Sequence, residues 1–146
     1  ADRPNRTVSY IQEPSICIVL QGEREIYLGN DCQNFDNSNL MFCPVNIPLS
    51  MHVKHASVDK PVIVLSMKLD LAMIREILAQ IPPARNTEEK HLGIKWHLDN
   101  TILAAFERLI NLLDYPNDIE FLSKLIQQEI YYRLLSAQRR IGSKHI

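Results

Sequence analysis

Two histidines, His52 and His55, are the side chains whose type and spacing most readily suggest catalytic or metal chemistry. Small β-barrel metalloenzymes usually hold a metal with strand histidines two residues apart, because alternate residues of a strand point to the same face. A spacing of three residues places the two rings on opposite faces. The other histidines, His91, His97 and His145, are not clustered in the sequence. We therefore predict no metal site and no cofactor.

The three cysteines, Cys17, Cys32 and Cys43, are a second source of possible chemistry. Their number is odd, and their spacing is not the close pairing of a zinc ribbon. Two of them lie in apolar, strand-like runs, where a free cysteine behaves as a small buried hydrophobic residue. The pattern favours reduced core thiols in a cytoplasmic protein. Reaction of such a thiol with an electrophile, for example an aldehyde, would require a lowered pKa and access.

Sequence motifs of common enzymes and nucleotide-binding sites are missing from the chain. It contains no GxGxxG, P-loop, GxSxG or HExxH pattern, and its four glycines are too scattered to surround a phosphate group. The formal net charge of −1 is not the basic surface that nucleic-acid binding requires. No apolar run approaches the ~20 residues that span a bilayer. We predict no catalytic residues, and no binding of this chain alone to DNA or to a membrane.

The first half of the chain, residues 1–69, has the pattern of β-strands separated by turns. The continuous apolar run at residues 16–20 is typical of a strand buried on both faces, and the charged run after Gly22 of a return strand near solvent. Apolar and polar residues alternate cleanly in residues 49–54. Strands are predicted at residues 16–20, 23–28, 32–35, 40–43, 49–54 and 61–69. This spacing indicates an antiparallel sandwich or barrel.

The second half, residues 70–146, has helical periodicity. Asp70 is predicted as the N-cap of a helix over residues 71–81. The polar residues 84–95 are predicted to form a loop, followed by a one-sided amphipathic helix over residues 98–114 that ends before Pro116. The last helix is predicted over residues 118–138, with Asn117 and Glu120 as a capping box.

The last helix differs from the others because it carries two apolar stripes on nearly opposite sides. The first stripe contains Ile119, Leu122, Ile126, Ile130, Leu134 and Ala137, and the second contains Phe121, Leu125, Tyr132 and Leu135. Such a helix must be covered twice, once by its own domain and once by either a neighbouring helix or another subunit. We predict a homodimer. The candidate interface residues are Phe121, Leu125, Gln128, Tyr132 and Leu135.

Several strings of the sequence resemble the N-terminal domain of one branch of AraC-type bacterial transcriptional regulators. The most specific are "EPSICIVLQG" and "IQQEIYYRLL", and the resemblance covers nearly the whole chain. It implies an α+β fold, with a cupin-like antiparallel β-barrel or jelly roll at residues 1–69 and a helical dimerisation unit at residues 70–146 packed on the barrel. It also implies a cytoplasmic domain that senses an unknown small-molecule effector. Contact with DNA would be made only by a C-terminal pair of helix-turn-helix motifs, which this chain does not contain.

An effector inside the barrel would be lined by inward-facing strand residues. The candidates are Cys17, Val19, Cys43, Met51, Val64 and Ser66. Two other classes of function stay open. A cupin-type enzyme would need two histidines at strand spacing i, i+2, a carboxylate and a later histidine, of which the predicted strands supply only His52. An oligomerisation scaffold would have a barrel filled by its own side chains.

Overall fold

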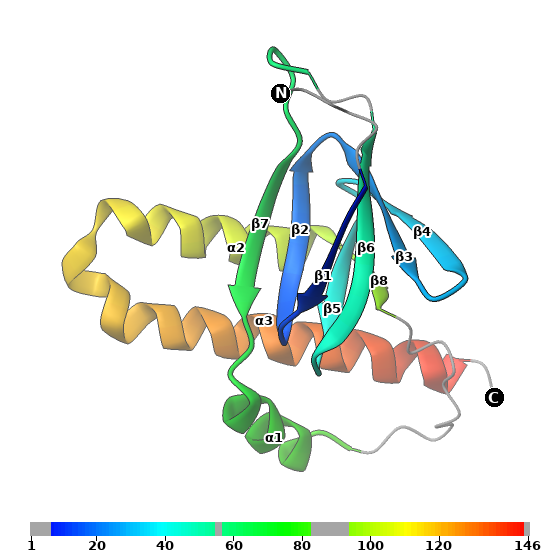
Figure 1. Cartoon of the computed structure of the whole chain (residues 1–146). Helices are drawn as coiled ribbons and strands as arrows, with labels where there is room; N and C mark the ends of the chain where they lie inside the picture. Colours follow the sequence, from blue (N-terminus) through cyan, green and yellow to red (C-terminus); the bar gives the residue numbers. More distant parts are fainter. Residues whose placement is uncertain (1–6, 55–56, 83–93, 145–146) are drawn as a thin grey trace. The chain divides into compact units, whose positions relative to one another are not determined.

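The computed structural model describes residues 7–54, 57–82 and 94–144, with side chains described as far as residue 137. These residues form two compact units (Figure 1). The β unit consists of residues 7–54, 57–69 and 94–98, and the helical unit of residues 70–82 and 99–144. The chain thus passes into the helical unit at the residue where the sequence pattern changes from strands to helices.

The described strands of the β unit form two four-stranded antiparallel sheets. The first sheet has the order β1-β6-β3-β4 and contains β1 (Thr7–Gln12), β6 (Ile47–Lys54), β3 (Glu23–Leu28) and β4 (Asp31–Phe35). The second has the order β7-β2-β5-β8 and contains β7 (Ile63–Lys68), β2 (Ser15–Gln21), β5 (Asn39–Cys43) and β8 (Lys95–His97). With the helices that follow, these sheets confirm the predicted α+β class.

Two glycines fix the turns on either side of β3. Gly29 has a φ of 62° and begins the two-residue connection to β4, a position that favours glycine. Gly22 has a φ of 87°, and a Cβ atom there would lie 2.7 Å from Cγ2 of Val62. Both the backbone conformation and the lack of space exclude a side chain at Gly22. This glycine is the single residue between β2 of one sheet and β3 of the other.

The core of the β unit contains buried side chains from both sheets. Its members are Cys17, Val19, Ile26, Phe35, Met41, Cys43, Leu49 and Ile94. Ile16 and Ile18 alternate with Cys17 and Val19 along β2 and are also buried, which confirms the prediction that this strand is buried on both faces. Leu20 is the exception. It is 42% exposed, because the register of β2 with β7 shifts between Val19 and Gln21.

The helical unit contains α1 (Leu71–Gln80), α2 (Asn100–Asn111), the short 3₁₀ helix η1 (Leu112–Asp114) and α3 (Pro116–Lys144). Asp70 caps α1 as predicted, since its side chain accepts a hydrogen bond of 3.1 Å from the backbone nitrogen of Met73. The two longest helices, α2 and α3, lie side by side (Figure 1), and Arg108 of α2 donates to Glu129 of α3. Among the described residues, no helix is long and apolar enough to cross a membrane.

Buried aromatic and aliphatic side chains hold α2 and α3 together. The buried members are Ile102, Ala105, Phe106, Leu112, Ile130, Tyr131 and Leu134. The hydroxyl oxygen of Tyr131 accepts a hydrogen bond of 3.0 Å from the backbone nitrogen of Asp70, so one side chain of α3 also fixes the start of α1. Other leucines of the helical unit are more exposed, with Leu113 at 71%, Leu71 at 38% and Leu78 at 36%.

The structure differs from the predicted elements in two strands and at both ends of α3. Strand β1 was not predicted, and β8 falls at the junction of the predicted loop and helix, because its pairing with β5 is a tertiary contact. Pro116 does not end a helix but begins α3, where its fixed φ suits the first helical position. Asn117 therefore lies inside α3 and is not its cap. The same helix continues past residue 138 to Lys144.

Candidate functional site

The residues predicted to line an effector site gather in the interior of the β unit. Cys17, Val19 and Cys43 belong to its buried core, and Met51 and Val64 are partly buried against the same core. Ser66 is exposed on β7, but its Oγ atom lies 3.6 Å from Sγ of Cys17, which donates to it. The fold thus brings together six residues that are spread over β2, β5, β6 and β7.

Arg24 introduces a positive charge into this apolar interior. It lies two residues before Ile26 on β3, shares the inward face of that strand, and is only 6% exposed. Its Nη1 atom donates to Sδ of Met51 at 3.2 Å, and its guanidinium also hydrogen-bonds to the hydroxyl of Tyr10. A thioether is a weak acceptor. The Nε atom of Arg24 is buried without a hydrogen-bond partner.

Cys43 and Tyr10, two titratable residues near Arg24, are uncharged near neutral pH. Burial raises the pKa of Cys43 to about 11, the nearby Cys17 adds to the shift, and Arg24 opposes it. Burial likewise raises the pKa of Tyr10, with Arg24 acting in the opposite direction. No ion pair of Arg24 occurs within the described residues. The arginine therefore faces a thiol and a phenol, neither of which balances its charge.

The cysteines differ in exposure. Cys17 and Cys43 are buried, as their apolar runs predict, whereas Cys32 is exposed on β4. A pKa of about 11 keeps the Cys43 thiol protonated, and the thiolate is the reactive form. The environment of Cys43 therefore disfavours reaction with electrophiles.

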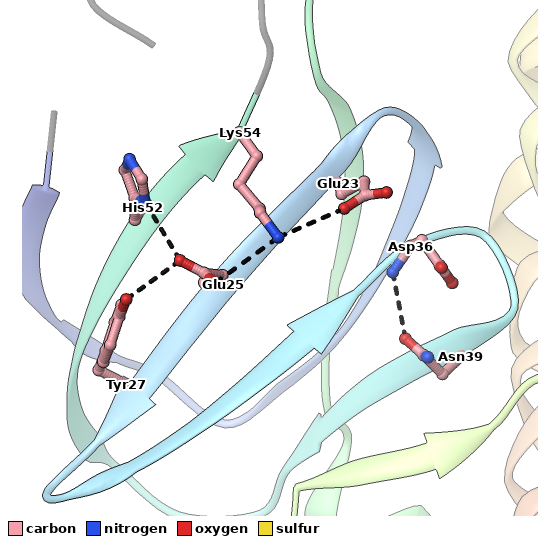
Figure 2. A network of polar contacts seen from close by, with 7 residues as sticks. All are labelled: Glu23, Glu25, Tyr27, Asp36, Asn39, His52 and Lys54. Atoms are coloured by element: carbon pink, nitrogen blue, oxygen red, sulfur yellow. Dashed lines mark hydrogen bonds and ion pairs between the residues drawn. The ribbon is translucent and has the colours of Figure 1, made fainter. Parts of the chain in front are cut away.

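The opposite face of the first sheet carries a polar network (Figure 2). Glu25 accepts hydrogen bonds from the hydroxyl of Tyr27 at 3.0 Å and from Nδ1 of His52 at 3.2 Å. Lys54 lies 3.7 Å from Glu25 and 3.8 Å from Glu23. The hydrogen bond from His52, followed by that from Tyr27, lowers the pKa of Glu25. His52 and Lys54 of this network are polar residues of the alternating run at residues 49–54. Their side chains lie on the face of β6 opposite to Leu49 and Met51.

An open hollow of about 650 Å³ lies beside this network. It is lined by Ser9, Tyr10, Ile11, Tyr27, Gly29, Pro48, Leu49 and Ser50, which come from β1, β3 and β6 and from the turn after β3. None of the six predicted lining residues contributes to it. Tyr10 and Leu49 line the hollow and also belong to or pack against the core, so the hollow borders the interior around Arg24.

Metal-ligating residues do not assemble in the part of the chain that the structure describes. No group of three or more histidine, cysteine, aspartate or glutamate residues there is placed to hold a metal ion. His52 is hydrogen-bonded to Glu25, and His97 is the last residue of β8. His55, His91 and His145 lie outside the described residues.

The two apolar stripes of α3 differ in exposure, but the first is not buried throughout, since its Leu122 is 38% exposed. In the first stripe, Ile130 and Leu134 are fully buried within the helical unit. In the second stripe, Phe121 is 72% exposed, Leu125 49% and Tyr132 53%. Gln128 is also exposed and Leu135 is partly buried. In the single chain the second stripe therefore presents a band of large apolar side chains to solvent.

Two residues central to this description, Arg24 and Tyr131, were not among the predicted site or core positions. The charge of Arg24 led us to predict a strand near solvent, whereas its spacing of two from Ile26 was the available sign that it points inward. Tyr131 belongs to neither predicted stripe of α3. It is buried, and its hydroxyl contacts the backbone of Asp70, a tertiary contact that the sequence pattern does not encode.

Comparison with known proteins identifies the family. The model of the AraC-type transcriptional regulator N-terminus matches residues 1–141. The crystal structure of an apo ToxT variant from Vibrio cholerae strain SCE256 is similar, with a TM-score of 0.73 and 8% sequence identity over 96% of this chain. This likeness confirms the cupin-like barrel with a helical unit, and the chain spans 54% of the ToxT chain. No curated protein matches the chain. With the family model covering nearly all of its length, the chain belongs to the family of AraC-type transcriptional regulator N-termini.

Proposed function

We propose that this chain is the effector-sensing and dimerisation part of a cytoplasmic transcriptional regulator, and that it acts by binding rather than by catalysis. The observation that carries the sensing role is the convergence of the predicted lining residues on the interior of the β unit around Arg24. Sequence-distant strands contribute to this interior, so a bound molecule would contact β2, β3, β5 and β6 together. Such a molecule would alter the packing of the whole β unit.

The DNA-binding function belongs to a part of the protein that lies beyond this chain. This chain spans 54% of the ToxT chain, which leaves room in a full-length relative for a further domain. The charge of −1 gives this chain no electrostatic attraction to DNA. The chain would therefore control placement of a DNA-binding domain without touching DNA itself.

Dimerisation is assigned to the second stripe of α3. Burying a large apolar side chain contributes roughly 1.5–3 kcal/mol, so Phe121, Leu125 and Tyr132 together favour association strongly. A two-fold axis brings the same surface of two subunits together. The assignment rests on the contrast between this exposed stripe and the buried one that contains Ile130 and Leu134.

The spacing within the second stripe favours an antiparallel pair of α3 helices. Phe121 and Leu135 are each seven residues from Gln128, and Leu125 and Tyr132 are three and four residues from it. An axis near Gln128 would therefore place Phe121 opposite Leu135 of the second copy, and Leu125 opposite Tyr132. A polar residue at the centre of an apolar interface can fix register, as a buried asparagine does in coiled coils.

The dimer is tested by sedimentation of the wild type and of the double variant Leu125→Asp, Tyr132→Asp. We expect a dimer at tens of micromolar for the wild type and a folded monomer for the variant, because two carboxylates would be desolvated in each copy of the interface. Leu113→Asp is the matched control, since Leu113 is 71% exposed and lies outside α3. A monomeric wild type, or a double variant that still dimerises, contradicts the assignment.

The sensing role is tested by a thermal-shift screen of neutral and charged metabolites. Specific binding raises stability by RT ln(1 + [L]/Kd), so a ligand present at 100 times its Kd contributes about 2.7 kcal/mol. A hit that is lost when Val19→Trp or Val64→Trp fills the interior supports an effector site in the β unit. An interior that takes up no molecule, with dimerisation intact, favours the filled oligomerisation scaffold.

A further inference from the structure

We propose that the open hollow beside the polar network of Glu25 binds a neutral, planar aromatic molecule that carries one group able both to donate and to accept a hydrogen bond, such as a carboxamide. The hollow has a volume of about 650 Å³. Pockets for small molecules usually have volumes of roughly 300–1,000 Å³. Because this place is on the outer face of the first sheet, the inference goes beyond the proposed sensing role of the interior and does not rest on it.

The register of the first sheet places part of the lining on its outer face. Ser50 of β6 pairs in register with both Ser9 of β1 and Tyr27 of β3, so these three side chains form one row across the hollow. Residues two positions apart along a strand share a face. The row therefore lies on the same face as His52 and Glu25, two residues along β6 and β3.

The hollow has raised sides and a low floor. Tyr27 stands on β3 at one side, and Ile11, which is 65% exposed, stands on β1 at the other. Between them β6 contributes only the compact side chains of Ser50 and Pro48 to the floor. Adjacent strands are roughly 4.8 Å apart, so β1 and β3 are about 10 Å apart and leave room for a ring. At Gly29 the hollow is open, since a Cβ atom there would meet nothing within 4 Å.

Tyr27 is held in a position that suits contact with an aromatic ring. Its hydroxyl donates to Glu25 at 3.0 Å (Figure 2), which orients the phenol, while the side chain is only partly buried. Aromatic pairs in offset or edge-to-face arrangements contribute more than their buried area alone. The aliphatic side chain of Ile11 on the other side adds apolar contact area. A flat ring is therefore a better match to the two sides than a flexible chain.

The charge around the hollow favours a neutral ligand. None of the residues that line it in the described part of the chain carries a charge. The carboxylate of Glu25 would repel an anion, and it already accepts from Tyr27 and His52 and lies 3.7 Å from Lys54. It therefore has its own partners and does not call for a cation from the ligand. Removing a charge from water without a counter-ion is costly.

A pair of serine hydroxyls supplies the polar part of the floor. The Oγ atoms of Ser9 and Ser50 lie 2.8 Å apart and share one hydrogen bond. Two hydroxyls carry two hydrogens and only one is used between them, so the other can donate to a ligand, while the oxygens keep lone pairs that can accept. A carboxamide offers both an acceptor oxygen and donor hydrogens, which matches this pair.

The experiment is a ligand-observed NMR titration of the chain 1–146 with four small compounds of similar size. Benzamide has the proposed chemistry, toluene lacks the polar group, benzoate is charged, and cyclohexanecarboxamide is not planar. We expect benzamide to bind most tightly. Toluene should bind about 2–10-fold more weakly, since a neutral hydrogen bond contributes roughly 0.5–1.5 kcal/mol. Benzoate should show no saturable binding.

Substitutions on the edge strand β1 test the place of binding. Ser9 is exposed, and Ser9→Trp would fill the hollow with an indole ring, so benzamide binding should weaken by more than about 10-fold as the contact area is lost. Thr7→Trp is the matched control, because Thr7 is exposed on the same strand and the same face but does not line the hollow. It should bind benzamide as the wild type does.

The double variant Ser9→Ala, Ser50→Ala tests the polar contact separately. It should weaken benzamide binding about 2–10-fold and leave toluene binding unchanged. Ile11→Ala should weaken binding of both, and it serves in place of Ser9→Trp if melting curves show that the tryptophan variant does not fold. The inference is overturned if benzamide does not bind, if benzoate binds equally well, or if binding persists in the folded Ser9→Trp and Ile11→Ala variants.

Discussion

The Nδ1 atom of His52 lies 3.2 Å from Oε1 of Glu25, across the paired strands β6 and β3 (Figure 2). This contact holds the imidazole ring against a carboxylate on the outer face of the sheet. The same carboxylate accepts from Tyr27. One face of β3 thus carries the hydrogen-bonded residues Glu25 and Tyr27, while the other carries Arg24 without a counter-ion.

The outer network predicts a measurable change in the titration of Tyr27. The hydrogen bond to Glu25, followed by one to Cys32, raises the pKa of Tyr27 to about 12 from 10.0. Glu25→Gln should therefore lower this pKa toward 10.0, because the negative charge that holds the phenolic proton is removed. Because the pKa of Tyr27 is raised in the folded chain, the protonated phenol stabilises the fold below about pH 10. This stabilisation is lost as the pH rises through about 12.

Ultraviolet titration of the phenolate checks this prediction. Subtracting the curve of Tyr27→Phe from that of the wild type isolates Tyr27 from the other tyrosines, and the same subtraction is made in the Glu25→Gln background. A Tyr27 curve that does not move when Glu25 is replaced would show that another group raises the pKa.

The buried thiols predict an order of alkylation. Cys32 is exposed, whereas Cys43 is buried and has a pKa of about 11. Iodoacetamide at mildly alkaline pH should therefore modify Cys32 first and Cys43 only when the protein unfolds, because the thiolate is the reacting species. Mass spectrometry of peptides at successive times measures the order. Rapid labelling of Cys43 in folded Cys32→Ser protein would instead support the reactive-thiol alternative.

The strands were predictable from the sequence where their burial pattern is strong. The apolar run at residues 16–20 and the alternation at residues 49–54 correspond to β2 and β6. Strand β8 was not predictable, because three residues carry no period and the strand exists through pairing with Asn39, Leu40 and Met41 of β5. Strand β1 has mostly exposed side chains and sits at the edge of its sheet, so it lacks a core-facing signal.

The candidate site was predicted in part. Hydrophobic pattern led to Cys17, Val19 and Met51, because a period of two assigns such residues to an inner face. The same rule would have placed Arg24 beside Ile26, but a charged side chain is normally assigned to solvent. Arg24 follows the turn at Gly22 and alternates with Glu25 along β3, so it shares the inward face with Ile26. A hydrophobic pattern therefore does not predict the polar residues of a binding site that lie inside a core.

Adjacent tyrosines on α3 provide a matched test of the helical unit. Tyr131 is buried and accepts a hydrogen bond from the backbone nitrogen of Asp70, while Tyr132 is 53% exposed. Tyr131→Phe should reduce the free energy of unfolding by about 0.5–1.5 kcal/mol, because the part-buried backbone N–H of Asp70 at the start of α1 loses its partner. Tyr132→Phe should change it by less than about 0.5 kcal/mol. Urea denaturation of both variants measures the difference, and equal effects would show that the Asp70 contact is not stabilising.

The antiparallel arrangement of two α3 helices predicts which engineered cysteines cross-link. A two-fold axis near Gln128 brings that residue next to itself in the second copy, so Gln128→Cys should form a disulfide-linked dimer under mild oxidation. The variant is made in a Cys32→Ser background, because Cys32 is the exposed native thiol. Phe121→Cys should not link to itself, since antiparallel pairing places it opposite Leu135, but the double variant Phe121→Cys, Leu135→Cys should. Lys124→Cys, exposed and on the flank of α3, is the control for random collision. Efficient self-linkage of Phe121→Cys without linkage of Gln128→Cys would mean that the helices pair in parallel or in another register.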